Sequence, residues 1–139
     1  MPEGVTTGRV PRGATERITR LGAELGLTSM GLGVVTLAPG ERNRVHRHAE
    51  QEEAYVVLSG RLLLLLDDGT VELGPLDVVR VAPTTRRQLT NPHDEPVVVL
   101  ALGASGEHRQ GDATAYSSFE EPVEAGRPPA EQPLPPDLG

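Results

Sequence analysis

The interior of the chain is a series of short apolar runs, each ended by a turn signal. The runs are four to nine residues long, valine and leucine dominate them, and proline, glycine, asparagine or aspartate follows each one closely. Short apolar runs that break roughly every ten residues are typical of strands joined by tight turns, and they predict an all-β sandwich or barrel. The runs cover residues 30–38, 54–58, 61–66, 70–73, 77–82, 87–90 and 96–103.

The two ends of the chain differ in composition from this interior. Residues 1–13 are rich in glycine, proline and threonine and are predicted to form a flexible arm. Residues 122–136 contain six prolines, a composition that favours extended and solvated backbone. We therefore expect a barrel domain with its flanking segments at residues 14–121 and a Pro-rich disordered or surface tail at residues 122–139. Residues 16–25 are compatible with a helical turn, although two glycines there disfavour it.

Composition limits the classes of function. With 139 residues the chain is expected to be one domain, and its net charge of −7 argues against nucleic acid or an anionic membrane as the main partner. There is no cysteine and no lysine, which excludes disulfides, thiolate nucleophiles, cysteine-based zinc sites and Schiff-base chemistry. The apolar runs are too short to span a membrane, and the N-terminus lacks the apolar segment of a signal peptide. We expect cytoplasmic localisation.

The five consecutive leucines at residues 62–66 break the alternation expected of a strand with one wet face. Both faces of this strand are therefore expected to be covered, one by the barrel interior. The cover for the other face is left open by the pattern. A second sheet layer, another subunit of a homodimer, or the chain's own N-terminal arm would each supply it.

Histidines and carboxylates are densest at residues 46–53, HRHAEQEE. In a strand, His46 and His48 project from the same face, so their ring nitrogens can share one metal ion. Glu52 and Glu53 have opposite parity, so only one of them can face the histidines, and spacing alone does not say which. The alternative is a pair of solvated surface histidines in a polar hairpin.

The spacing of these residues resembles the first signature of the cupins, which are small β-barrels with a double-stranded β-helix or jelly-roll fold. The matching positions are Gly40, His46, His48, Glu53 and Gly60. The resemblance covers residues 17–103 and implies the cupin-type jelly-roll barrel for this chain. It also implies that Glu53 rather than Glu52 faces inward, and that His46, His48 and Glu53 are three of the four usual metal ligands. The divalent ion would be Zn, Fe, Mn or Ni.

The second cupin signature is largely absent. Where the family has Gly, Pro, Gly, His and Asn, this chain has Leu76, Ala82, Thr84, Arg87 and Asn91. Arg87 therefore stands at the fourth ligand, and an arginine cannot bind a metal. If Arg87 points inward, it can pair with Glu53 and replace the ion. If it points outward, two histidines and one carboxylate remain, a ligand set that suits non-haem iron or open zinc sites.

Two further histidines have less support as ligands. His93 is a conceivable replacement for the fourth ligand, but it lies in the turn NPHDEP beyond the strand, where histidines are usually solvated. His108 is expected at the surface.

Three classes of function remain open, because fold alone does not choose among them. The first is a metal-dependent enzyme of oxygenase, isomerase, decarboxylase or lyase type acting on a small polar molecule. The second is a module that binds an organic anion through Arg87, Arg80 or Arg86, with or without metal. The third is a structural barrel in which Arg87 pairs with Glu53. In each case we expect a homodimer that binds neither nucleic acid nor membrane, and in the first two a small-molecule ligand.

Overall fold

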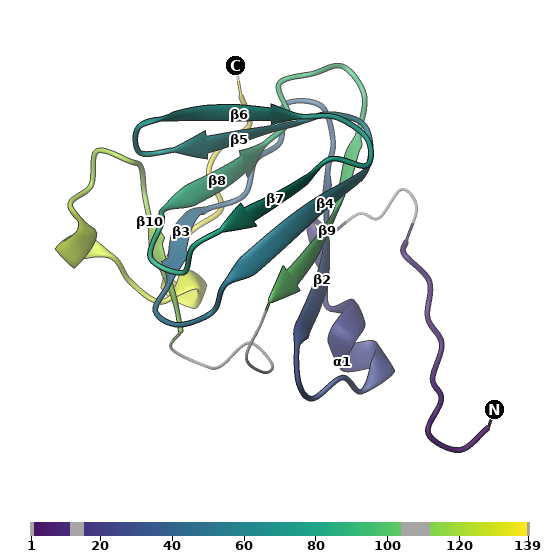
Figure 1. Cartoon of the computed structure of the whole chain (residues 1–139). Helices are drawn as coiled ribbons and strands as arrows, with labels where there is room; N and C mark the ends of the chain where they lie inside the picture. The colour runs from purple at the N-terminus through teal and green to yellow at the C-terminus, as the bar shows by residue number, and fades with distance from the viewer. Residues whose placement is uncertain (1, 12–15, 104–111, 139) are drawn as a thin grey trace.

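Two five-stranded sheets pack face to face in the computed structural model, which describes residues 2–11, 16–103 and 112–138 (Figure 1). All strand pairings between the named strands are antiparallel. The first sheet contains, in spatial order, β1 (Ile18–Thr19), β2 (Gly31–Leu37), β9 (Val97–Gly103), β4 (Glu53–Ser59) and β7 (Val78–Val81). The second contains β10 (Ala113–Tyr116), β3 (Val45–His48), β8 (Arg87–Thr90), β5 (Leu62–Leu66) and β6 (Gly69–Leu73).

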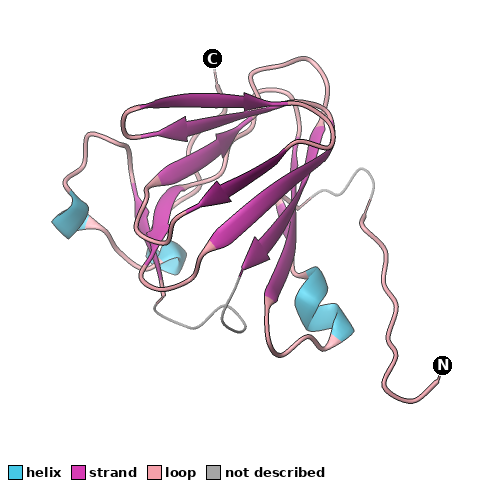
Figure 2. Cartoon of the chain, viewed as in Figure 1, coloured by secondary structure: helices cyan, strands magenta, loops and turns pink. Residues whose placement is uncertain are grey.

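Strands account for most of the regular structure (Figure 2). The predicted all-β barrel is therefore confirmed, and each of the seven apolar runs contains a strand. The sequence missed β10, because its four residues ATAY are short and lack the Val/Leu run that marks the others. The two glycines within residues 16–26 were expected to disfavour a helical turn there. The turn does form, as α1 (Leu21–Leu25), and Gly26 ends it in the left-handed conformation with φ 77°. Among the described residues, no helix is long and apolar enough to cross a membrane.

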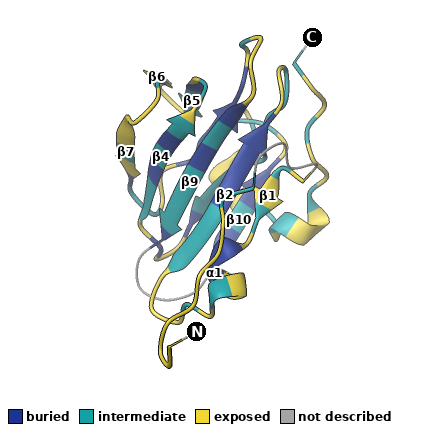
Figure 3. Cartoon of the chain, turned by 90° about the vertical axis from the view of Figure 1, so that its right-hand side faces the viewer, coloured by how far each residue is buried: buried dark blue, intermediate teal, exposed yellow. Residues whose placement is uncertain are grey.

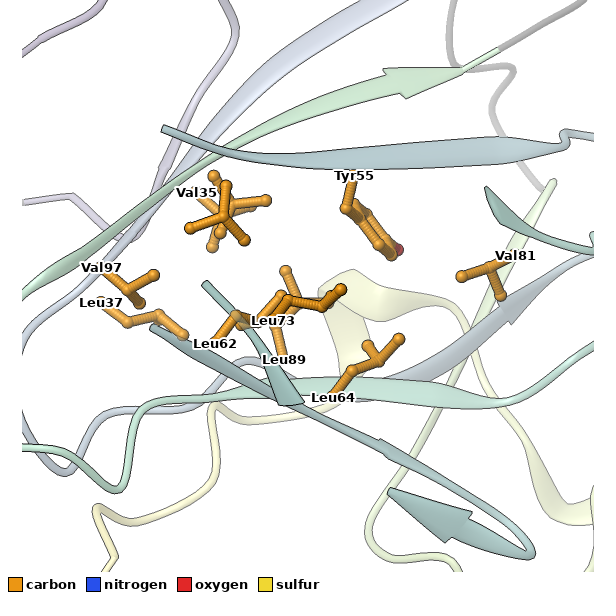
Figure 4. Close-up of a cluster of buried hydrophobic side chains, with 11 residues drawn as sticks. Val35, Leu37, Tyr55, Leu62, Leu64, Leu73, Val81, Leu89 and Val97 are labelled. Carbon is orange, nitrogen blue, oxygen red and sulfur yellow. The ribbon is translucent and has the colours of Figure 1, made fainter. Parts of the chain in front are cut away.

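The core lies between the sheets and is aliphatic (Figure 4). Seven strands, β2 and β4 to β9, contribute residues to it, and where a strand contributes two they alternate along it, as the period of two requires. Tyr55 is the one aromatic residue of the cluster, and its remaining members are valines and leucines. These are Val35, Leu37, Val57, Leu62, Leu64, Leu73, Val81, Leu89, Val97 and Val99.

The five-leucine strand β5 is covered on both sides, as its composition indicates. Leu62 and Leu64 are fully buried in the core. On the other face, Leu65 lines a cavity together with Phe119 and Leu134, so part of its cover comes from the C-terminal segment of the same chain. The N-terminal arm lies elsewhere, beside α1, where the Thr6 hydroxyl donates a hydrogen bond to the Leu25 carbonyl. The strand therefore does not by itself require a second subunit.

The Pro-rich C-terminal segment runs over the second sheet and includes two 3-10 turns, Val123–Ala125 and Pro129–Glu131. It pairs with the edge strand β10 through two backbone hydrogen bonds between Ala115 and Arg127, at 2.7 and 3.0 Å. Its far end returns to the barrel where the Leu138 amide donates to the Gly40 carbonyl. Exposed residues are concentrated in the two terminal segments, while β4, β9 and β2 are largely buried or half-buried (Figure 3). Whether the barrel folds without residues 122–139 stays a prediction.

Candidate metal and ligand site

Three potential metal ligands meet near one end of the barrel. His46 and His48 lie on β3 and point inward, and Glu53 is the first residue of β4 in the opposite sheet. One ligand atom from each of the three lies within 4.8 Å of the others. The structure thus places Glu53 with the histidines, whereas Glu52 is outside the barrel in an ion pair with Arg80.

Both histidine rings are held by an acceptor at Nδ1. The Nδ1 of His46 lies 2.9 Å from the Arg44 carbonyl oxygen, and that of His48 lies 2.9 Å from Oδ2 of Asp112. A carbonyl and a carboxylate can only accept, so each Nδ1 carries a proton and donates it. The Nε2 atoms are then turned toward Glu53, with Nε2 of His48 3.2 Å and Nε2 of His46 3.8 Å from Oε1.

The Glu53 carboxylate receives all of these contacts on one oxygen. Besides the histidines, Oε1 accepts hydrogen bonds from the Tyr55 hydroxyl at 2.7 Å and from the Arg87 guanidinium at 2.6 Å. Oε2 takes no hydrogen bond within the described part of the chain. The carboxylate is therefore fixed through Oε1, and its second oxygen remains available for another partner.

Arg87 points into the barrel, and its side chain is fully buried. It lies across the ladder from His46, as expected for the fourth-ligand position. Its donors are satisfied by the carboxylate of Glu53, by the Tyr55 hydroxyl at 3.2 Å and by three backbone carbonyls. Those carbonyls belong to Ala82, Pro83 and Thr85 and lie at 3.3, 3.0 and 2.6 Å. The guanidinium is thus a fixed part of the site wall.

The electrostatics of this group favour an ionised carboxylate. Burial acts to raise the pKa of Glu53, but the histidines and the positive charge of Arg87 outweigh it, and the pKa lies well below its ordinary value. Burial and the neighbouring Glu53 charge raise the pKa of Tyr55, which keeps its hydroxyl protonated as a donor. Burial also raises the pKa of Asp112, but the Glu50 amide and His48 outweigh it and lower that pKa overall.

Two adjoining cavities open onto the group. One, of about 240 Å³, is lined by His46, His48, Glu53 and Tyr55 among others. The other, of about 370 Å³, also reaches Glu53 and lies beside α1 and β2. The space exists because the inward positions at this end of β2 and β9 are small. These are Gly31, Gly33, Ala101 and Gly103, which share a face with Tyr55 and Glu53 through the ladder, and the Gln51 side chain fills the space directly at Gly103.

Other residues that the sequence raised lie away from this site. His93 is beside Glu72, with its Nε2 2.7 Å from the carboxylate, and does not belong to the group of three ligands. Arg86 is buried outside the barrel, where it binds Asp67 and the carbonyls of Phe119 and Glu121. Its guanidinium also stacks over the Tyr116 ring at 4.8 Å. Arg80 faces solvent. The prediction that Arg86 or Arg80 binds an anion inside the barrel is therefore wrong. His108 lies outside the described residues.

Sequence reasoning missed four contributors: Asp112, Tyr55, Arg20 and Arg44. Arg20 and Arg44 line the cavity that contains the histidines. Arg44 could have been found, because it has the same strand parity as His46 and His48. Asp112 is 64 residues from His48 in sequence and carries no local signal.

The donor set fits a divalent ion. Imidazole nitrogens and a carboxylate oxygen are standard ligands of zinc and iron, and both histidines have the outer hydrogen-bond partner at Nδ1 that metal-ligating histidines usually have. The ligating carboxylate is also hydrogen-bonded, by Tyr55 and Arg87. Arg87 at the fourth position limits the protein ligands to three.

Comparisons with known proteins agree with this architecture. A family model described as a cupin domain matches residues 33–103, about half of the chain. A sugar phosphate isomerase of the cupin superfamily from Silicibacter pomeroyi has a similar structure, with TM-score 0.61 and 34% identity over 73% of this chain and 64% of that one. A cupin protein from Bacteroides fragilis has TM-score 0.60 and 25% identity, covering 73% of this chain and 86% of that one.

A curated relative matches over a shorter region. It is an uncharacterized protein from Methanocaldococcus jannaschii, 31% identical over 61 residues, which is 44% of this chain and 49% of the relative. The chain thus spans about half the length of this relative and slightly under two thirds of the isomerase structure.

Proposed function

The chain belongs to the cupin superfamily, and from this premise we propose that it holds a divalent metal ion with His46, His48 and Glu53 and uses it to bind or transform a small polar molecule. The observation that carries the proposal is the orientation of the two imidazoles. Each is anchored by hydrogen bonding at Nδ1, so that both Nε2 atoms converge on the Glu53 carboxylate.

The short distances between the Nε2 atoms and Oε1 require a proton or a metal ion between these groups. Two Nε2 lone pairs directed at an ionised carboxylate repel it, unless a proton or a metal ion lies between them. A metal ion removes the repulsion for all three groups together. Arg87 and Tyr55 then act as orienting partners, because both hold the carboxylate through Oε1.

A bound ion would supply Lewis-acid polarisation of a hydroxyl or carbonyl oxygen of the ligand. With three protein ligands, coordination positions stay open for that oxygen. The chain itself contributes the walls: Ala101 and Gly33 leave room for the molecule, and Tyr55 and Arg87 keep the carboxylate oriented. The likeness to the Silicibacter pomeroyi isomerase supports a phosphorylated sugar as the substrate class and isomerisation as the reaction.

A metal-free barrel is the second candidate, and the 2.6 Å ion pair between Arg87 and Glu53 favours it. In this alternative the guanidinium takes over the electrostatic role of the ion, and the site binds its ligand without metal or is purely structural. The two candidates make opposite predictions for chelation and for metal titration.

The test is metal analysis of the purified full-length protein, followed by calorimetric titration of the chelated protein with Zn²⁺, Mn²⁺, Ni²⁺ and Fe²⁺. We expect one ion per chain and a melting temperature that falls on chelation, because an ion bound only to the native state stabilises it by mass action. His46→Ala and Glu53→Gln should lose the ion, and His93→Ala should keep it. A wild-type protein that binds none of these metals, with its melting temperature insensitive to chelator, would establish the metal-free barrel.

We also propose a cytoplasmic homodimer. The outward face of the first sheet supports an interface, because Val56, Leu100 and Leu102 are apolar, only half-buried and adjacent in the ladder. Light scattering should give about twice the chain mass of 14.8 kDa. A monomer at micromolar concentration would remove the dimer and leave the metal proposal unaffected.

A further inference from the structure

We infer that Arg20 anchors an oxyanionic group of the ligand, a phosphate or a carboxylate, at the mouth of the cavity, with Arg44 on the opposite side of the same cavity. This inference rests on the proposed function in one respect, that the barrel receives a small molecule at the His46, His48 and Glu53 group. It adds the side chain that recognises the anionic group of that molecule.

Arg20 is placed at the junction of the two cavities. It lines both of them, and within the described ranges Glu53 is the one other charged residue that does the same. Arg20 directly follows β1, whose Thr19 pairs with Val34, so it continues the inward row formed by Gly33, Ala101 and Tyr55. Because Gly33 and Ala101 are small, open space lies between Arg20 and Tyr55.

The Arg20 guanidinium has no polar partner among the described residues, with which it makes no hydrogen bond and no ion pair. This contrasts with Arg17, Arg86 and Arg87, each of which binds a carboxylate. The five donors of Arg20 are therefore available to an oxyanion, which a guanidinium binds in a bidentate manner.

Arg44 adds a second positive charge to the same cavity. It precedes His46 by two residues and lines the cavity from the second sheet, opposite Arg20. Its Nε donates to the Gln132 carbonyl, which ties the side chain to the C-terminal segment. Pro129 of that segment also lines the cavity. The segment thus positions one of the two cations.

The charge balance of the cavity is opposite to that of the chain. The whole protein carries a net charge of −7. Among the described residues, two arginines and one carboxylate line the smaller cavity, and that carboxylate, Glu53, is already neutralised by Arg87. Inside a cleft with low-dielectric walls such an excess of positive charge attracts anions, and a bound divalent ion would strengthen it.

The experiment uses three probes with the same carbon skeleton: ribose 5-phosphate, ribonate and neutral ribose. Each is titrated calorimetrically into the full-length chain, once chelated and once loaded with Mn²⁺. We expect at least one of the two anions to bind roughly tenfold or more tightly than ribose, and Arg20→Gln to remove that advantage. Arg20→Lys should restore part of it. Preference for ribose 5-phosphate over ribonate, or the reverse, identifies the oxyanion.

The matched control is Arg47→Gln, which removes the same charge from the outward face of β3, one residue from His46. It should leave the affinity for both anions unchanged. Equal affinity for ribose and the two anions, or undiminished anion binding in Arg20→Gln, would overturn the inference. Metal affinity measured on the same proteins separates the two proposals. Arg20-dependent anion binding without metal binding refutes only the metal site, and metal binding without an anion preference refutes this inference and the phosphorylated-sugar substrate class but leaves the metal site standing.

Discussion

The two halves of the same strands have opposite compositions. In β2 the inward residues are Gly31 and Gly33 at one end and Val35 and Leu37 at the other. β9 changes in the same way. Its inward positions are Gly103 and Ala101 at the end with the cavities, here called the open end, and Val99 and Val97 at the other end, here called the closed end.

This contrast assigns different tasks to the two ends of the barrel. At the closed end, valine and leucine fill the space between the sheets and provide the burial that stabilises the fold. At the open end, the missing side chains leave cavities, and the polar residues of β3 and β4 face them. Changes at the closed end should therefore affect stability first, and changes at the open end should affect binding first.

Arg87 lies at the boundary between the two ends, and its removal should have the largest effect on stability. Arg87→Met leaves the Glu53 carboxylate buried without its cation and removes a donor from three carbonyls, of which those of Ala82 and Pro83 keep a backbone donor. Breaking a buried pair in this way costs about 3–5 kcal/mol. Urea denaturation of the chelated protein measures this loss.

The double variant Glu53→Gln/Arg87→Met is the control for that prediction. It removes the unpaired charge and should recover part of the lost stability. If Arg87→Met alone were as stable as the wild type, the ion pair would not be part of the site wall.

Leu64→Ala tests the closed end. Leu64 is fully buried in the core, and truncating a leucine in such a position costs about 2–5 kcal/mol. Metal affinity of the protein that remains folded should be unchanged, because Leu64 does not line the cavities at the open end. A large drop in metal affinity at unchanged stability would show that the two ends are not separable.

Ala101→Leu tests the open end by filling its space. Ala101 lines both cavities, so the larger side chain should block the ligand while costing at most about 1–3 kcal/mol, the usual range for overpacking. Ala54→Leu makes the same change on the outward face of β4 and should leave ligand binding intact. Retained affinity for the anion in Ala101→Leu would contradict the placement of the ligand.

Leu76→Gly should have the smallest effect, and it should be stabilising. Leu76 occupies the position where the second cupin signature has glycine, and it adopts φ 71°, a left-handed conformation that costs an L-residue about 1–2 kcal/mol. Its side chain is 77% exposed, so little packing is lost. Glycine also increases the entropy of the unfolded chain, which offsets part of this gain. The free energy of unfolding, measured by urea denaturation, should therefore rise by about 0.5–1 kcal/mol. Leu76→Ala keeps the Cβ atom and should gain nothing.

Periodicity accounts for what the sequence could predict. The Val/Leu runs and turn residues determine the strands, and the parity of β3 places His46 and His48 on one face. Parity could not show whether Glu52 or Glu53 faces the histidines, because that depends on where β4 begins. The family resemblance chose Glu53, which the structure places beside the histidines.

Long-range packing accounts for what the sequence could not predict. Nothing local to Arg87 says whether it points inward; its direction is determined by Glu53, 34 residues away, and by three carbonyls of the preceding turn. Likewise, Asp112 reaches His48 only because β10 pairs with β3. The cavities follow from small residues on β2 and β9 that become neighbours only in the folded sheet.

The most direct test of the account is a crystal structure grown with Mn²⁺ or Zn²⁺, with anomalous data collected at the absorption edge of the metal. We expect one ion peak at the open end, bound by Nε2 of His46, Nε2 of His48 and a carboxylate oxygen of Glu53 at about 2.0–2.2 Å. Arg87 should still hold the Glu53 carboxylate. Density that shows no ion between these three side chains at saturating metal would contradict the account.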